Sequence, residues 1–261
     1  MSPFMRRFGI SILANTGFDP RVLWAAARGI VPFMRDYWQF TKAVKLSNSK
    51  ARTYLAPILA DRFLAAGSFP RHYFMQDLWA ARRIYELMPI HHVDVGSRID
   101  GFVAHILPFC KVTVLDVRPL PNAGIANLSF RQADLMQLDK ALIGTCDTLS
   151  CLHAIEHFGL GRYGDSIDAL GHIKGLKALA SMLKPNGRLI ISVPISTSPR
   201  IEFNAQRVFA PNDVPMHLAR ERLLLSKFDY LDDNDTLIAG QLPSEIIRLN
   251  YGCGLYEFVA T

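Results

Sequence analysis

The pattern of hydrophobic positions is most informative between Ile90 and Leu120, where a strand, a helix and a second strand follow one another. Strands are expected at residues 91–95 and 112–116, where Val93, Val95 and the run Val112–Leu115 give the apolar, β-branched character of strands buried on both faces. Between them, apolar residues recur at helical spacing: Phe102, Val103, Ile106 and Leu107. A strand, a short crossover and a parallel strand open a doubly wound sheet, whose ligands lie beyond the carboxyl ends of the strands.

The same patterns continue along the chain and predict an α/β fold. Further strands are expected near residues 128–131, 147–151, 187–193 and 255–260. Further helices are expected near residues 57–66, 73–87, 100–109, 168–183 and 215–227. Residues 196–214 are polar, contain prolines and have no clear period. We interpret this stretch as a substrate-side insertion after the fifth strand.

Asp116 ends the second predicted strand, 20 residues after Gly96. A carboxylate there can accept hydrogen bonds from both hydroxyls of a ribose, so the unit predicts a nucleoside-type cofactor. A dinucleotide needs Gly-x-Gly-x-x-Gly around its pyrophosphate, whereas this turn reads Gly96-Ser-Arg-Ile-Asp100-Gly101. Asp100 near the helix start would repel a pyrophosphate but attract an ammonium group. S-adenosylmethionine has an ammonium group and no phosphate, so the sequence favours it over NAD.

Five short motifs follow one another in a recognisable order. They are Asp94-Val-Gly96, Asp116, Asp134 in Phe130-Arg-Gln-Ala-Asp134-Leu135, the block Cys146–His157, and the block Leu183–Pro194. In this order and spacing the chain resembles class I S-adenosylmethionine-dependent methyltransferases over about residues 90–261. The form DVGSRIDGF of the first motif also resembles a bacterial domain family of unknown function, whose members are taken to be methyltransferases.

The resemblance implies a Rossmann-like α/β fold with a seven-stranded, mainly parallel sheet and helices on both faces. It further implies an antiparallel last hairpin and a helical N-terminal extension. On this basis the residues assigned to binding of S-adenosylmethionine are Asp94, Gly96, Ser97, Arg98, Gly101, Asp116, Val117, Asp134 and Leu135.

Four of these assignments have alternatives that the sequence leaves open. Asp116 either accepts hydrogen bonds from a ribose or has a capping role. Arg98 stands where the family has its second glycine, and either pairs with the methionine carboxylate or points to solvent. Asp94 either contacts the cofactor or ties down the glycine turn through backbone N–H groups. Asp134 either lies beside the adenine or serves as a turn aspartate.

Charge is concentrated at the N-terminus. Residues 1–52 contain nine Lys or Arg and two acids, which gives +7, and the remaining residues are therefore near −1, because the whole chain carries +6. The segment is also aromatic. We interpret residues 1–88 as a basic helical extension and residues 89–261 as the methyltransferase-like domain. The extension either caps the domain, contacts an acidic acceptor or lies peripherally on an anionic membrane; nucleic acid is disfavoured because no binding motif accompanies the charge.

The four cysteines have no paired spacing, which is typical of reduced thiols in a cytoplasmic protein. Neither a signal peptide nor an apolar run of transmembrane length is evident in the sequence. We therefore expect a cytoplasmic protein, with peripheral membrane contact as an option through residues 1–52.

His153-Ala-Ile-Glu156-His157 follows the fourth predicted strand, on the methyl-transfer face implied by the resemblance. Either histidine could accept the proton of an acceptor hydroxyl, because imidazole titrates near neutral pH. Alternatively, Glu156 and the histidines form a hydrogen-bonded loop. A third interpretation is a zinc peptidase, since His-x-x-Glu-His on a helix presents both histidines on one face, with Glu202 or Glu221 as the third ligand. Glycines at 159, 161 and 164 disfavour such a helix.

No acidic cluster indicates a divalent metal, so we assign no metal ligands. No Asn-Pro-Pro-Tyr-like motif points to methylation of an amide or base nitrogen. We therefore predict O-methylation of a small polar or sugar-type acceptor, with His153 or His157 as the base. The alternative function is a non-catalytic nucleoside-cofactor-binding protein on a methyltransferase-like scaffold.

Overall fold

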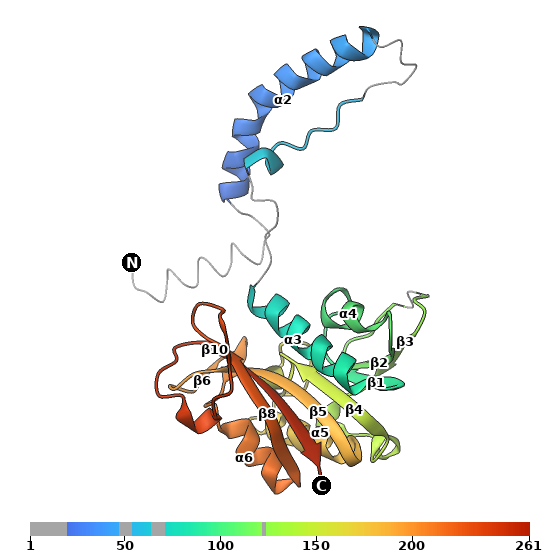
Figure 1. Ribbon diagram of the computed structural model, residues 1–261, viewed down its shortest axis with the longest axis vertical. Coiled ribbons are helices and arrows are strands. Elements are labelled where there is room, and N and C mark those ends of the chain that lie inside the picture. Colours follow the sequence, from blue (N-terminus) through green and yellow to red (C-terminus); the bar gives the residue numbers. More distant parts are fainter. Residues whose placement is uncertain (1–19, 47–53, 64–70, 122–123) are drawn as a thin grey trace. The chain divides into compact units, whose positions relative to one another are not determined.

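The computed structural model describes residues 20–46, 54–63, 71–121 and 124–261 (Figure 1). The chain divides into two compact units, Met1–Phe69 and Pro70–Thr261. This division places the helix that begins at Arg71 in the second unit, whereas the sequence analysis set the boundary after residue 88.

The first unit contains the long helix α2 (Pro20–Leu46) and a 3-10 turn, η1 (Asp61–Phe63). The helix predicted at 57–66 is wrong over residues 57–60, is reduced to the 3-10 turn at residues 61–63, and lies outside the described residues at 64–66. Residues 54–59 instead lie against α2 without regular structure. Gly29 permits this close approach, because a Cβ on it would lie 2.0 Å from the Leu59 carbonyl oxygen. An ion pair between Asp36 and Arg62 also joins the two segments.

The second unit is built around an eight-stranded sheet in the order β3-β2-β1-β4-β5-β10-β8-β9 (Figure 1). Strands β1 to β5 are parallel, β10 is antiparallel to β5 and β8, and β9 is antiparallel to β8. The strands are β1 (His91–Val95), β2 (Lys111–Asp116), β3 (Leu128–Gln132), β4 (Cys146–Leu152), β5 (Leu183–Ile195), β8 (Leu223–Leu231), β9 (Leu237–Ala239) and β10 (Gly252–Ala260). The predicted mainly parallel sheet with an antiparallel last hairpin is confirmed, and the short β9 adds an eighth strand.

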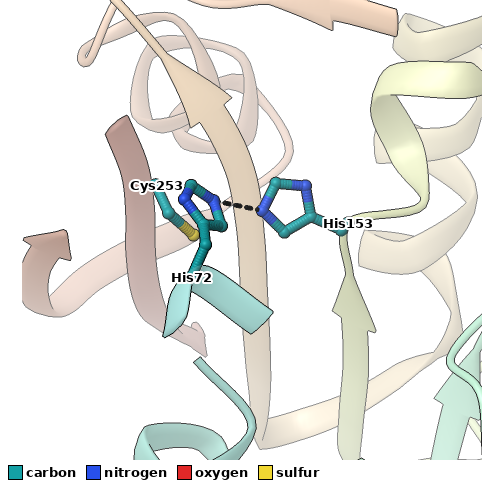
Figure 2. A group of neighbouring side chains, drawn as sticks. All are labelled: His72, His153 and Cys253. Carbon is teal, nitrogen blue, oxygen red and sulfur yellow. Dashed lines mark hydrogen bonds between the residues drawn. The ribbon is translucent and has the colours of Figure 1, made fainter. Parts of the chain in front are cut away.

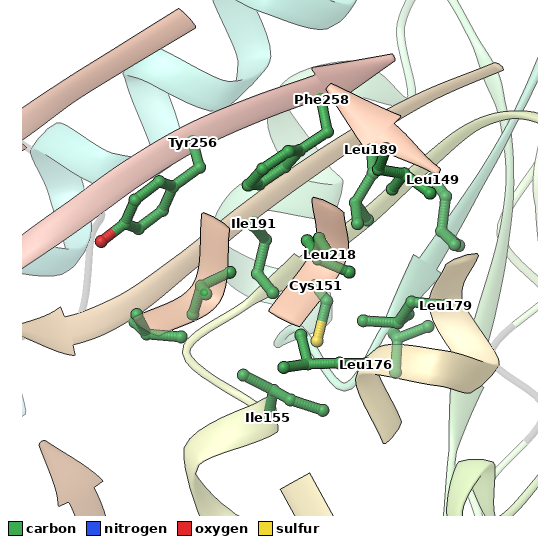
Figure 3. Close-up of a cluster of buried hydrophobic side chains, with 14 of the residues drawn as sticks. Leu149, Cys151, Ile155, Leu176, Leu179, Leu189, Ile191, Leu218, Tyr256 and Phe258 are labelled. Carbon is green, nitrogen blue, oxygen red and sulfur yellow. The ribbon is translucent and has the colours of Figure 1, made fainter. Parts of the chain in front are cut away.

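Helices cover both faces of this sheet. They are α3 (Arg71–Leu87), the π-helical turn η2 (Ile99–Val103), α4 (Ala104–Ile106), α5 (Gly171–Met182) and α6 (Asp213–Arg220). Trp79 and Ile84 of α3 pack with Phe102 on one face, whereas Leu176 and Leu179 of α5 belong to the cluster on the other face (Figure 3). Successive residues of β5 enter opposite clusters, which explains why the central strands are apolar at nearly every position.

The helix predicted at 215–227 is half wrong, because α6 ends at Arg220 and β8 begins at Leu223. Arg222 has a φ of 62°, a left-handed conformation that ends the helix. The following residues instead pair with β10 as an inner strand. The helix predicted at 100–109 is shorter than expected, because Gly101 has non-helical dihedral angles (φ −109°, ψ −121°).

The stretch interpreted as an insertion after the fifth strand forms a small antiparallel hairpin, β6 (Arg200–Glu202) with β7 (Gln206–Val208). All four cysteines are free and buried. Within the described ranges, no helix is both long and apolar enough to cross a membrane.

Candidate functional site

A buried carboxylate holds the turn at the end of β1. Asp94 is 0% exposed and accepts hydrogen bonds from the Ser97 backbone N–H (3.0 Å) and the Ser97 hydroxyl (2.9 Å). It also accepts a hydrogen bond from the Ser150 hydroxyl of β4. Burial raises the pKa of Asp94 to about 6, and these donors act against the rise. The alternative role of Asp94, tying down the glycine turn, is therefore the one its contacts show.

Arg98 and Asp100 face solvent and each other. Their side chains form a two-pronged ion pair with distances of 2.9 Å (Nε to Oδ1) and 2.7 Å (Nη2 to Oδ2), and they are 83% and 71% exposed. Gly101 lies against α3, where a Cβ would approach Asp77 Oδ2 to 2.9 Å. These two departures from the usual glycine pattern therefore neutralise each other at the surface.

A pocket lies at the point where the order of the parallel strands reverses, between β1 and β4. It is next to the carboxyl ends of β1, β4 and β2. Its empty volume is about 550 Å³, including the part open to solvent. Its lining residues are Val95, Gly96, Leu115, Asp116, Val117, Arg118, Ala133, Asp134, Leu135, Met136, His153, Ala154, His157, Phe158, Tyr163 and Asp165. The pocket thus unites five of the predicted cofactor residues and both predicted histidines. The lining residues do not include Asp94, Ser97, Arg98 or Gly101, which shape the turn behind Gly96 or face away from it.

Asp116 and Asp134 enter this pocket already hydrogen-bonded. Asp116 accepts from the Arg118 backbone N–H (2.8 Å), from its Nε (3.0 Å) and from its Nη2 (2.7 Å). The Arg118 guanidinium also lies over the Tyr163 ring, 4.3 Å from its centroid. Asp134 accepts from the Met136 N–H (2.8 Å) and so caps a 3-10 turn. A ribose at Asp116 would have to replace the side-chain bonds of Arg118, whose side chain is 48% exposed.

Glu156 is fully buried between the two predicted histidines. Its Oε1 lies 2.7 Å from His153 Nδ1 and 3.7 Å from His157 Nε2. His157 Nδ1 donates to the carbonyl of Ala205, in the β6–β7 turn, at 2.7 Å. Burial lowers the pKa of His157, and the charges of Arg162 and His153 lower it further against the opposing effect of Glu156 and the Ala205 carbonyl. The lowered pKa favours the neutral form of His157, in which the unprotonated nitrogen is Nε2, 3.7 Å from Glu156 Oε1.

The zinc-peptidase interpretation fails because the motif is not on an α-helix. Residues Ile155–His157 form a 3-10 turn, and His153 precedes it with a φ of 47°. His153 points instead toward His72 of α3 and Cys253 of β10 (Figure 2). The two Nε2 atoms of His72 and His153 are 2.9 Å apart.

The sequence analysis did not select His72, Cys253, Arg118 or Tyr163. His72 and Cys253 lie 81 positions before and 100 positions after His153. The three come together only because α3 packs on the sheet and β10 lies one strand away from β4, on the other side of β5. Arg118, by contrast, carries a local signal, since it follows Asp116 by two residues and a cation there can reach the same carboxylate.

A family model described as "Caenorhabditis protein of unknown function, DUF268" matches residues 125–238, less than half of the chain. The matched segment begins after the DVGSRIDGF turn and does not include it. A comparison with curated protein sequences finds no match.

Several solved structures share the fold of this chain. A protein from Galdieria sulphuraria, described as a sarcosine dimethylglycine methyltransferase, has a TM-score of 0.54 at 13% identity over 72% of this chain and 86% of its own. The N-methyltransferase NodS from Bradyrhizobium japonicum WM9, solved with S-adenosylhomocysteine, has a TM-score of 0.50 at 16% identity over 73% and 88%. The [4+2]-cyclase SpnF has a TM-score of 0.52 at 11% identity over 77% and 82%. The chain therefore has the fold of class I S-adenosylmethionine-dependent methyltransferases, a fold that also serves a cyclase.

The conformation of Gly96 gives a testable prediction about the pocket floor. Gly96 has a φ of 76°, and a Cβ on it would lie 2.8 Å from the Ala154 Cβ. Gly144 has a similar φ of 64° but open space around it, so Gly144→Ala is a matched control. Both substitutions should cost about 1–2 kcal/mol of unfolding free energy for the left-handed backbone, and Gly96→Ala should cost at least about 1 kcal/mol more for overpacking. Urea denaturation measures both values, and equal losses would contradict close packing at Gly96.

Proposed function

We propose that this protein binds S-adenosylmethionine in the pocket and transfers the methyl group to a small polar acceptor. The observation that carries the proposal is the position of Asp116 in the pocket, at the carboxyl end of β2 and opposite the glycine turn after β1. A carboxylate at this place is suited to a ribose. The solved complex of NodS with S-adenosylhomocysteine, on the same fold, supports the choice of cofactor.

The charge of the pocket also favours S-adenosylmethionine over a dinucleotide. Three carboxylates line it, those of Asp116, Asp134 and Asp165, against the guanidinium of Arg118 and the two imidazoles of His153 and His157. A pyrophosphate would meet net negative charge, whereas a sulfonium and an ammonium group would be attracted. Asp100 does not contribute to this charge, because Arg98 neutralises it at the surface.

For the chemistry we propose O-methylation with His157 as the base. The sulfonium makes the methyl carbon electrophilic, so the acceptor oxygen bonds to that carbon while the carbon–sulfur bond breaks, leaving S-adenosylhomocysteine. The acceptor proton passes to His157 Nε2, because Nδ1–H is held by the Ala205 carbonyl. His153 is the less suitable base, since its Nδ1 faces Glu156 and its Nε2 faces His72. The nature of the acceptor, a sugar or another small polar molecule, is part of this proposal.

The first unit contains a helix suited to contact with a membrane surface, where an acceptor could be reached. Helix α2 carries Arg28, Arg35, Lys42 and Lys45 together with exposed aromatic side chains, Trp24 at 67% and Trp38 at 68%. Aromatic and basic side chains on one amphipathic helix suit an anionic membrane surface. We therefore include peripheral contact with the cytoplasmic face of a membrane in the proposal, with the free thiols consistent with a reducing compartment.

The runner-up function is a cofactor-binding protein without methyl transfer, and SpnF shows that the fold also serves other chemistry. Incubation with a cell extract and S-adenosylmethionine labelled in its methyl group separates the two. Label in the small-molecule fraction supports the transferase. Binding of S-adenosylhomocysteine without label in any fraction supports the binding protein.

Asp116→Ala tests the ribose contact. Loss of the carboxylate that accepts the ribose hydrogen bonds should weaken binding of S-adenosylhomocysteine by about 1.5–3 kcal/mol, roughly 10- to 150-fold. The control is Asp147→Ala, which removes an exposed aspartate that pairs with Lys184 at the opposite end of β4 and should leave the affinity unchanged. Calorimetric titration measures both. If Arg118→Ala weakened binding as much as Asp116→Ala, Asp116 would act by holding Arg118 and not by binding ribose.

His157→Asn tests the base. An asparagine keeps an N–H donor for the Ala205 carbonyl but cannot take up a proton, so the loop should stay folded while the transfer rate falls about 10²- to 10⁴-fold. In the wild type the rate should rise with pH through an inflection below 6.5, because the lowered pKa means that His157 loses its proton there. That inflection should vanish in the variant. A variant with the wild-type rate and pH profile would reduce His157 to a structural role.

A further inference from the structure

Three metal-ligating side chains converge at the end of the pocket marked by His153. His72 comes from the first turn of α3, His153 from the end of β4 and Cys253 from β10 (Figure 2). One donor atom from each lies within 4.8 Å of the others. No local sequence motif predicts this cluster, because its three members are far apart in the chain.

The partners of the two imidazoles fix which nitrogen faces the centre. His153 Nδ1 lies 2.7 Å from the Glu156 carboxylate, which can only accept, so this nitrogen carries the proton. His72 Nδ1 lies 3.5 Å from the Asp235 carboxylate and is oriented in the same sense. In the neutral rings both Nε2 atoms then present lone pairs to each other at 2.9 Å. Such a pair repels unless a cation lies between them, and carboxylates behind the Nδ1 atoms are the usual support of metal-binding histidines.

The charges around the group also call for a cation. Glu156 and Cys253 are both essentially inaccessible to solvent. Glu156 Oε2 has no hydrogen-bond partner within the part of the chain that the structure describes. A divalent ion bound to a Cys253 thiolate and backed by Glu156 would bring the net charge of the group to zero, which lowers the cost of burying these charges.

We propose that His72, His153 and Cys253 bind a zinc ion, with Glu156 and Asp235 orienting the two imidazoles. Two nitrogens and one sulfur form a ligand set that zinc accepts. Bonds of about 2.0–2.3 Å place tetrahedral ligands about 3.3–3.8 Å apart. The donors lie within 4.8 Å of one another and the two Nε2 atoms are 2.9 Å apart. Metal binding therefore moves the widest pair closer by about 1 Å and the two imidazole nitrogens apart by about 0.4 Å. The site itself stands on this geometry and does not depend on the proposed function.

One consequence does rest on the proposed function. Three protein ligands leave one tetrahedral position for water or for an oxygen or sulfur atom of a bound molecule. His153 also lines the proposed cofactor pocket. A hydroxyl or thiol acceptor bound at that position would have a lowered pKa, which makes these the acceptor classes that the ion favours.

The competing arrangement is a shared proton. Although burial alone opposes it, the charges of Cys253 and Glu156 raise the pKa of His153 well above its ordinary value. A protonated His153 would donate to His72 Nε2 without any metal. The two arrangements differ in metal content and in the state of the Cys253 sulfur, and both can be measured.

The experiment uses the full chain, purified without an affinity tag and without chelators. Inductively coupled plasma mass spectrometry should find one equivalent of zinc per chain. After replacement by cobalt, the near-ultraviolet spectrum should contain a sulfur-to-cobalt charge-transfer band. His72→Ala and Cys253→Ser should abolish stoichiometric binding, and Glu156→Gln should weaken it by about 10- to 100-fold. The controls are His91→Ala, an exposed histidine at the start of β1, and Cys110→Ser, a buried thiol outside the group. Both should retain one equivalent.

Wild-type protein that is folded but takes up neither zinc nor cobalt stoichiometrically, or that binds cobalt without the sulfur band, would overturn the site in favour of the shared proton. Titration of the same samples with S-adenosylhomocysteine separates the two proposals. Cofactor binding without metal binding refutes the zinc site alone. Metal binding without cofactor binding refutes the proposed function alone.

Discussion

The buried carboxylate of Asp94 is the constraint on which the pocket depends. Its oxygens accept bonds from Ser97 in the turn and Ser150 in β4, and Ser150 in turn contacts His92 Nε2 at 2.8 Å. The strand end, the turn and the neighbouring strand are therefore tied to one point inside the sheet. Because a buried charge without these donors would be costly, the arrangement of Gly96 opposite Ala154 follows from it.

The polar chain continues away from the pocket. His92 Nδ1 lies 2.9 Å from the Thr148 hydroxyl, and burial lowers the pKa of His92 to about 3. A neutral imidazole thus links two hydroxyls of β4 within the sheet. This explains why β1 carries histidine and aspartate at positions where a buried strand ordinarily carries apolar residues.

How much the sequence could predict depends on whether the signal is local. The predicted strands at 91–95 and 112–116 are marked by Val93, Val95 and the run Val112–Leu115, and they are confirmed as β1 and β2. The helix predicted at 215–227 is wrong beyond Arg220, because the run of three leucines from Leu223 fits either period and pairing with β10 makes it part of β8. Gly96, Asp116 and Asp134 follow strand ends and could be placed in one pocket. His72 and Cys253 could not, because their proximity to His153 arises from helix and strand packing.

The loop that follows β4 is held in place by the hairpin of β6 and β7. The Ala205 carbonyl in the β6–β7 turn accepts from His157 Nδ1 and from Arg162. The hairpin between β5 and α6 therefore holds one wall of the pocket.

The central claim is that the pocket at Asp116 is built for S-adenosylmethionine. Parallel calorimetric titrations of the wild-type chain with S-adenosylmethionine and with NAD test it most directly. The account predicts saturable binding of S-adenosylmethionine with one site per chain and no heat of binding with NAD. Tight binding of NAD without any response to S-adenosylmethionine would contradict it.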